Sequence, residues 1–178
     1  AYFCANPKCT AKNRRGMQHF VNAFEIMLVG PQILDRFKED GLISDAADLF
    51  ILKKEDISGL ERFGEKSAEN IVKSIQEHSK VTLSRFIYSL GILHVGEQTS
   101  NDLANHFGTL GRLTKTTLEE VSGIENIGPV IAKSIYDWFN QKENIRFVEK
   151  LLANGVKIQA LTKSVSNKFS GKTFVITG

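Results

Sequence analysis

Apolar residues along the chain recur in a pattern that is typical of short helices separated by tight turns. After each of four glycines, Gly30, Gly64, Gly96 and Gly128, apolar or small residues return four, seven and eleven positions later. These offsets place them on one face of an α-helix. An apolar residue also precedes each glycine. The pattern therefore predicts that each glycine lies at the start of a helix with one buried face.

The regular spacing of these glycines indicates an internal repeat. Gly64, Gly96 and Gly128 are 32 residues apart, and Gly30 precedes Gly64 by 34 residues. Helical spacing also occurs before the turns, as in the segment LSRFIYSLG from residue 83. The predicted unit is a helix, a tight turn and a second helix, repeated four times. Few strands are expected before the last ten residues, apart from a short ribbon near the cysteines.

A glycine at the start of a helix would give an anion access to the backbone. The first amides of a helix have no partner within the helix, and the helix dipole adds partial positive charge there. Because glycine has no side chain, a phosphate can approach those amides closely. In Gly30-Pro31 and Gly128-Pro129 the proline falls at an early helical position, where its missing N–H matters little. The turns are therefore candidate phosphate sites.

The composition fits a folded protein whose positive charge lies near its ends. The chain has 178 residues, of which 42% are hydrophobic, so a buried core is expected. No apolar run reaches the roughly 20 residues that a membrane helix needs. Residues 1–15 and 157–178 each hold four basic and no acidic residues, whereas residues 16–156 hold 15 basic against 20 acidic ones. Basic ends suit an anionic partner. Because residues 16–156 are net acidic, anion binding by that segment must depend on local geometry.

Two cysteines near the N-terminus are candidates for half of a metal site. Four residues, including Asn6 and Pro7, separate Cys4 from Cys9. Such a pair suits zinc, but a structural zinc site needs four ligands, and the chain has only two cysteines. His19 follows in a segment, MQHFV, that looks like the start of a helix, which favours a packed or solvated histidine. A disulfide between the cysteines is the alternative.

Taken together, these parts resemble the C-terminal part of bacterial NAD⁺-dependent DNA ligases. The segment LERFGEKSAENI, from residue 60, resembles the helix-hairpin-helix motif, whose amides hold the DNA backbone without reading its sequence. The cysteine pair, the segment QHFV, four hairpins and the final FSGKTFVITG follow the family's order of zinc finger, four helix-hairpin-helix motifs and BRCT domain. The resemblance implies a mainly α fold with two paired units. It divides the chain into the second half of a four-cysteine zinc finger (1–22), a DNA-binding domain (23–160), and a linker with the start of the BRCT domain (161–178).

The resemblance also implies cofactors, partners and location. Cys4 and Cys9 would form half of a zinc site whose other two ligands lie upstream of Ala1. NAD⁺ and magnesium would belong to the parent enzyme and not to this segment. The partners would be nicked duplex DNA, held by its backbone through the minor groove, and the N-terminal ligase domains of the same chain. A monomer without membrane attachment, in the bacterial cytoplasm with the nucleoid, is expected.

The residues predicted to contact DNA follow from the turns. The family usually has a second glycine two residues before the turn glycine, where this chain has Leu28, Arg62, His94 and Asn126. Leu28 departs most from that pattern, so a packing role is predicted for the first hairpin. Amides of the other three hairpins, with charged support from three arginines, are the predicted contacts: Gly64, Lys66, Gly96, Gln98, Gly128, Val130, Arg62, Arg14 and Arg15.

Two patterns suggest catalysis, and the chemistry favours neither. The run of residues 38–41 fits the Lys-x-Asp-Gly motif that forms a lysyl-adenylate in nucleotidyltransferases, but Lys38 lies between acids on a polar helix face, and a nucleophilic lysine needs a lowered pKa. Lys66 stands where helix-hairpin-helix glycosylase-lyases place a reactive lysine, but the carboxylate that they need downstream is missing. The segment itself is therefore predicted to be non-catalytic. The alternative to DNA binding is a helical protein-interaction scaffold.

Overall fold

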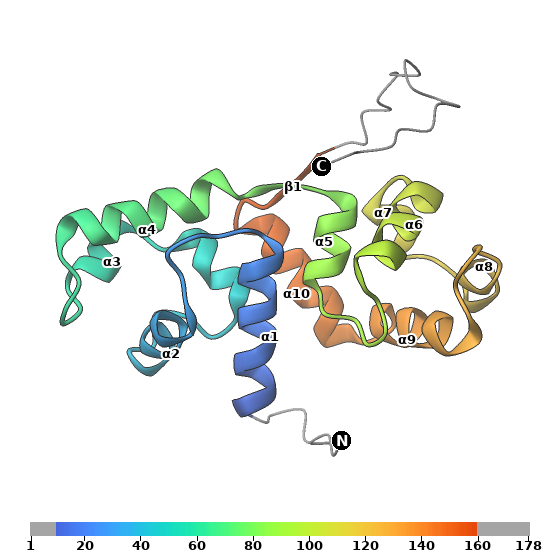
Figure 1. Ribbon diagram of the computed structural model, residues 1–178, viewed down its shortest axis with the longest axis horizontal. Coiled ribbons are helices and arrows are strands. Elements are labelled where there is room, and N and C mark those ends of the chain that lie inside the picture. The colour runs from blue at the N-terminus through green and yellow to red at the C-terminus, as the bar shows by residue number, and fades with distance from the viewer. Residues whose placement is uncertain (1–9, 160–178) are drawn as a thin grey trace, which may run out of the picture.

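The computed structural model describes residues 10–159, with side chains from residue 14 onward, and consists mainly of short helices (Figure 1). The mainly α-helical class predicted from the sequence is thereby confirmed. The cysteine pair and residues 160–178, with the expected first BRCT strand, lie outside the described range. Within that range, no helix has the length and apolar character needed to cross a membrane.

The first group of helices is built around the turns that contain Gly30 and Gly64. One helix leads into each turn and a second helix leaves it, and a short 3-10 helix connects the two pairs. In Figure 1 most of this group lies at the left. Its elements are α1 (Thr10–Ala23), α2 (Pro31–Glu39), η1 (Ala46–Ile51), α3 (Lys54–Ser58) and α4 (Glu65–Glu77).

The second group has the same order of parts, around the turns that contain Gly96 and Gly128. A short helix, α7, takes the place that η1 has in the first group. The two groups meet where α1 packs beside α5, in the middle of Figure 1. The elements are α5 (Leu83–Ser89), α6 (Glu97–Phe107), α7 (Leu110–Leu113), α8 (Leu118–Ser122) and α9 (Pro129–Phe139).

Each group has its own hydrophobic core. In the first, the rings of Phe20 and Phe24 are stacked with their centroids 4.3 Å apart. In the second, Leu103, Phe107 and Ile135 are buried. Because α1 contributes to the first core, the domain boundary predicted between residues 22 and 23 falls inside a helix that packs with the hairpins.

The residue four positions after each turn glycine is buried, as the helical spacing predicts. Leu34 is 2% exposed, and Ala68, Ser100 and Ala132 are fully buried. Three of these four side chains are small, so the helix on which each lies can approach its neighbour closely. The first turn instead has leucine, which needs a wider space between its helices.

A strap of two elements connects the second group back to the first. Helix α10 (Lys142–Ala153) follows α9, and its Val148 and Leu151 are buried in the first core. Strand β2 (Lys157–Gln159) then pairs in parallel with β1 (Lys80–Thr82), the link between α4 and α5. The sequence did not predict this strand pair, because three residues are too few to show an alternating pattern.

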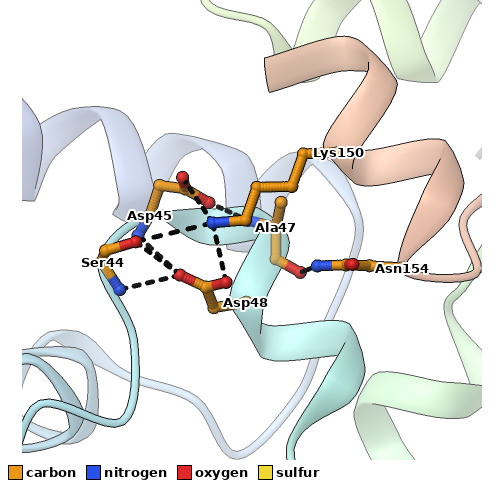
Figure 2. A network of polar contacts seen from close by, with 6 residues as sticks. All are labelled: Ser44, Asp45, Ala47, Asp48, Lys150 and Asn154. Carbon is orange, nitrogen blue, oxygen red and sulfur yellow. Dashed lines mark hydrogen bonds and ion pairs between the residues drawn. The ribbon is translucent and has the colours of Figure 1, made fainter. Parts of the chain in front are cut away.

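Polar contacts fix the strap to the start of η1 (Figure 2). The Lys150 Nζ lies 2.7 Å from Oδ1 of Asp48 and 2.9 Å from Oδ2 of Asp45. At the C-cap of α10, the Asn154 side-chain amide donates a hydrogen bond of 2.8 Å to the carbonyl oxygen of Ala47. Since about 100 residues of sequence separate the partners in each contact, these bonds hold the strap against the first group.

The network changes the ionisation of its members. Burial opposes the charged form of Asp48, but hydrogen bonds from Lys150, from the Ser44 hydroxyl and from the amides of Ser44 and Asp45 outweigh it and lower the pKa of Asp48 from 3.8 to about 2. Burial likewise opposes the charge on Lys150, and hydrogen bonds to Asp48 and Asp45 outweigh it and raise the pKa of Lys150. The charged network is therefore favoured across the neutral range of pH.

Replacing Lys150 by methionine is expected to lower the free energy of unfolding by about 1–2 kcal/mol near pH 7, because two carboxylates lose their cation. The contribution of Asp48 is present above its unfolded pKa of 3.8 and is lost as the pH falls through its folded pKa of about 2. The difference between the two proteins in urea unfolding should therefore shrink between about pH 4 and pH 2. Lys133→Met, which removes an exposed pair with Asp137, is the control and should change stability by less than about 0.5 kcal/mol. Equal losses in both variants would contradict the role of the network.

Candidate nucleic-acid interface

All four turns have the same backbone conformation. The residue two positions before each glycine has a left-handed backbone, with φ of 68° at Leu28, 73° at Arg62, 66° at His94 and 67° at Asn126. The glycine that follows is extended and is the N-cap of the next helix, with φ of −82°, −87°, −94° and −74° in chain order. The missing second glycine therefore does not alter the turn, even where leucine replaces it.

The departure of Leu28 from the family pattern leaves the backbone of the first turn unchanged. The sequence predicts that it serves packing, because Leu28 departs most from the family pattern. Its backbone nevertheless matches the other three turns, and the Leu28 side chain is 59% exposed. Leu28 thus does not pack in the core, and its left-handed backbone is a strain of about 1–2 kcal/mol for a residue with a Cβ.

Leu28→Gly is expected to stabilise the protein by about 0.5–1 kcal/mol, because relief of the strained φ exceeds the backbone entropy that glycine adds to the unfolded chain. The exposed side chain contributes little packing that could be lost. Thermal and urea unfolding would measure the change. Asn126→Gly is the matched control, with a smaller effect, since asparagine tolerates this conformation well. A loss of stability in Leu28→Gly would show that the leucine packs against the protein after all.

Amides at the helix starts are left open in these turns. None of the four glycine caps supplies a side-chain hydrogen bond, whereas Thr82 and Thr117 cap α5 and α8 through their hydroxyl oxygens. Among the described residues, the amides of Lys66, Gln98 and Val130 have no hydrogen-bond partner. They are free to bind an anion at the positive end of the helix dipole.

The protein's own structure does not require glycine at these four positions. An extended φ is open to any residue, and a Cβ built on Gly30, Gly64, Gly96 or Gly128 would meet nothing within 4 Å. Glycine therefore keeps the open amides accessible from outside the protein. This is the geometry that close approach of a phosphate needs.

The predicted charged contacts are only partly available. Arg62 and Lys66 are both exposed and belong to the same turn, and Arg15 is exposed on α1. Arg14 instead forms an ion pair with Asp35 of α2, with Nη2 and Oδ2 2.5 Å apart. The Gln98 side-chain amide donates a hydrogen bond of 3.0 Å to Asp102, which leaves the backbone N–H as the predicted contact of this residue.

Acidic residues near the turns oppose strong anion attraction. Glu65 is the first residue of α4 and pairs with Lys54 at 3.0 Å, and Glu61 and Glu125 lie in the turns themselves. The hydrogen bond with the Glu65 carboxylate raises the pKa of Lys54. Since the charges around the turns are mixed, phosphate binding there must depend mainly on amides.

The predicted metal ligands, Cys4 and Cys9, lie outside the described residues. Within residues that are described, no group of three or more His, Cys, Asp or Glu side chains is placed to hold a metal ion. His19 lies on α1 and contacts Tyr88 of α5: its Nε2 is 2.7 Å from the Tyr88 carbonyl oxygen, and the two rings are edge to face. This histidine therefore joins the two groups of helices, in agreement with a packed residue.

The lysine of the Lys-x-Asp-Gly pattern lies at the end of a helix. Helix α2 ends at Glu39, Asp40 is its C-cap, and Gly41 has a φ of 72°. The carboxylate of Asp40 pairs with Arg36 at 2.5 Å, and the Gly41 amide donates to the carbonyl oxygen of Lys38 at 3.2 Å. The pattern is thus explained by the left-handed glycine that terminates a helix.

Comparison with known proteins gives two kinds of match. Residues 85–148 match the family model described as helix-hairpin-helix motif. DNA ligases from Methylacidiphilum infernorum, Desulforudis audaxviator and Carboxydothermus hydrogenoformans are 40%, 42% and 41% identical to this chain. The matches cover 98%, 99% and 100% of the chain but only 26%, 27% and 27% of those ligases, so the chain spans about a quarter of their length. The resemblance to DNA ligases that the sequence predicts is confirmed.

Proposed function

We propose that this chain grips duplex DNA, because it is similar along nearly all its length to one part of the bacterial DNA ligases. It would bind the phosphodiester backbone at a nick, through the minor groove and without reading base sequence. The observation that supports this most directly is the set of glycine caps, which neither backbone conformation nor packing requires.

In this proposal each turn binds one stretch of phosphodiester. The open amides at Lys66, Gln98 and Val130 would donate hydrogen bonds to phosphate oxygens, and the exposed Arg62 would add a charge-assisted contact. Such contacts position a protein on DNA but carry no sequence information. Because the strap fixes the two groups to each other, their turns would act together on either side of a nick.

The chemistry of ligation would belong to other domains of the parent enzyme. The parent would be an NAD⁺-dependent ligase that uses magnesium, with its adenylation lysine outside this segment. Cys4 and Cys9 would supply two thiolates of a structural zinc site. Metal analysis of the full-length protein and of its Cys4→Ser variant tests this point, since the variant should lose one equivalent of zinc.

Titration of the chain against fluorescent nicked duplexes of two unrelated sequences, at low and at high salt, tests the proposed function. Binding should be weak, equal for both sequences and weaker as salt rises. Because acids accompany the turns, the affinity should vary with salt as if only about two to four phosphates were neutralised. Absence of binding at low salt would contradict the proposal and favour a protein-interaction scaffold.

A further inference from the structure

Large exposed hydrophobic side chains are concentrated at the turns. Six such residues occur in the part of the chain with described side chains, and four of them lie in a turn or within two residues after its glycine: Met27 (66% exposed), Leu28 (59%), Leu93 (66%) and Val130 (65%). The other two, Ile51 and Leu152, lie elsewhere. Exposed apolar residues gathered at one kind of site indicate an interaction surface.

The apolar character alternates between the turns of each group. We define the tip of a turn as the two residues that precede the apolar residue before its glycine. The tips of the first turn in each group are Met27-Leu28 and Leu93-His94, and the tips of the second are Glu61-Arg62 and Glu125-Asn126. Each group therefore has one tip with exposed apolar side chains and one tip with an acid.

These exposed apolar side chains make no visible contribution to the stability of the folded protein. Leu28 is both exposed and strained, and Met27 holds its place through its backbone, whose carbonyl oxygen accepts a hydrogen bond of 2.8 Å from Ser74. Leu93 directly precedes the left-handed His94 and is 66% exposed. Their side chains thus face solvent beside the amides that would hold a phosphate.

We propose that Leu93, and Met27 with Leu28 in the other group, pack against the deoxyribose rings that flank the bound phosphates. This inference rests on the DNA binding proposed above. The C–H faces of the sugars are the apolar surface nearest to a phosphate, and the tip lies only two or three residues before the glycine cap. Because residues 16–156 hold more acids than bases, this contact would supply affinity that charge does not.

A contact of this kind has a distinctive dependence on salt. Counterion release makes phosphate contacts weaker as salt rises, whereas burial of apolar surface releases no counterions. Leu93→Ser should therefore weaken binding to a nicked duplex by about tenfold at every salt concentration, with an unchanged salt slope. Arg62→Gln, which removes the charge proposed to contact a phosphate, should instead reduce the salt slope by about one, and its effect should fade at high salt.

The matched controls are Leu152→Ser, an exposed leucine on α10 outside the turns, and Leu93→Met, which keeps an apolar side chain. Both should bind like the unsubstituted chain, and circular dichroism should show that all variants fold. If Leu93→Ser binds as tightly as the unsubstituted chain, or lowers the salt slope, the inference is overturned while the proposed function stands. If the unsubstituted chain does not bind DNA at low salt, the proposed function fails and this inference fails with it.

Discussion

Replacing Gly64 and Gly128 together by valine is expected to weaken binding to nicked duplex DNA by about 30- to 100-fold without unfolding the protein. A branched side chain on each cap would stand over the open amides and keep the phosphate at a distance, and hydrogen bonds to a charged group are worth about 1.5–3 kcal/mol each. The fold should survive because each glycine is extended and has free space around its Cβ position. Fluorescence anisotropy would measure binding and thermal unfolding would measure stability.

Gly111→Val is the matched control for this experiment. Gly111 also has nothing within 4 Å of its Cβ position, but it lies inside α7 and not in a turn. Its substitution should leave DNA binding unchanged. Undiminished DNA binding by the double variant would show that the turns are not the contact surface.

Ala132→Leu is expected to destabilise the protein by about 2–3 kcal/mol, because a larger side chain must be forced into a closely packed helix pair. Ala132 is fully buried, four residues after Gly128, where α9 packs against α8. The first turn accommodates leucine at the equivalent Leu34, so the requirement for a small residue is local to the turn and not a property of the motif.

Urea unfolding would measure this loss, with Ala153→Leu as the control. Ala153 is an exposed alanine at the end of α10, so the same change of side chain adds no buried volume there. Its effect should stay within about 0.5 kcal/mol. Equal stability of the two variants would show that the space between α8 and α9 accommodates a leucine at position 132.

The turns could be located from the sequence because their signals are local. A glycine followed by apolar residues at helical spacing marks a helix start, and a proline directly after Gly30 or Gly128 reinforces it. The structure places an N-cap at each of these glycines. The left-handed backbone at Leu28 and Arg62 could not be predicted from residue type, since neither leucine nor arginine is enriched in that conformation.

Contacts between distant parts of the chain could not be predicted in this way. The spacing of apolar residues in residues 142–153 is helical, but nothing local shows that Val148 and Leu151 pack in the first group. The ion pair of Arg14 with Asp35 likewise depends on how α1 and α2 pack, although the Arg14 side chain stays 56% exposed. A single sequence shows which residues form elements, whereas partners across the fold depend on tertiary packing.

The strap also determines the order in which the protein can fold as it is synthesised. The buried residues of the second core all lie between Leu83 and Phe139, so that core is complete once its own segment has left the ribosome. The first core needs Val148, Leu151 and Val156, which are made after the whole segment of the second core. In refolding of the whole chain the first core must also close the long loop to these residues, so pulsed hydrogen exchange should show protection in α5–α9 before α1–α4. Of the two groups, the one that is made first is therefore completed second, and its core keeps an open apolar surface until residues 148–156 have been made.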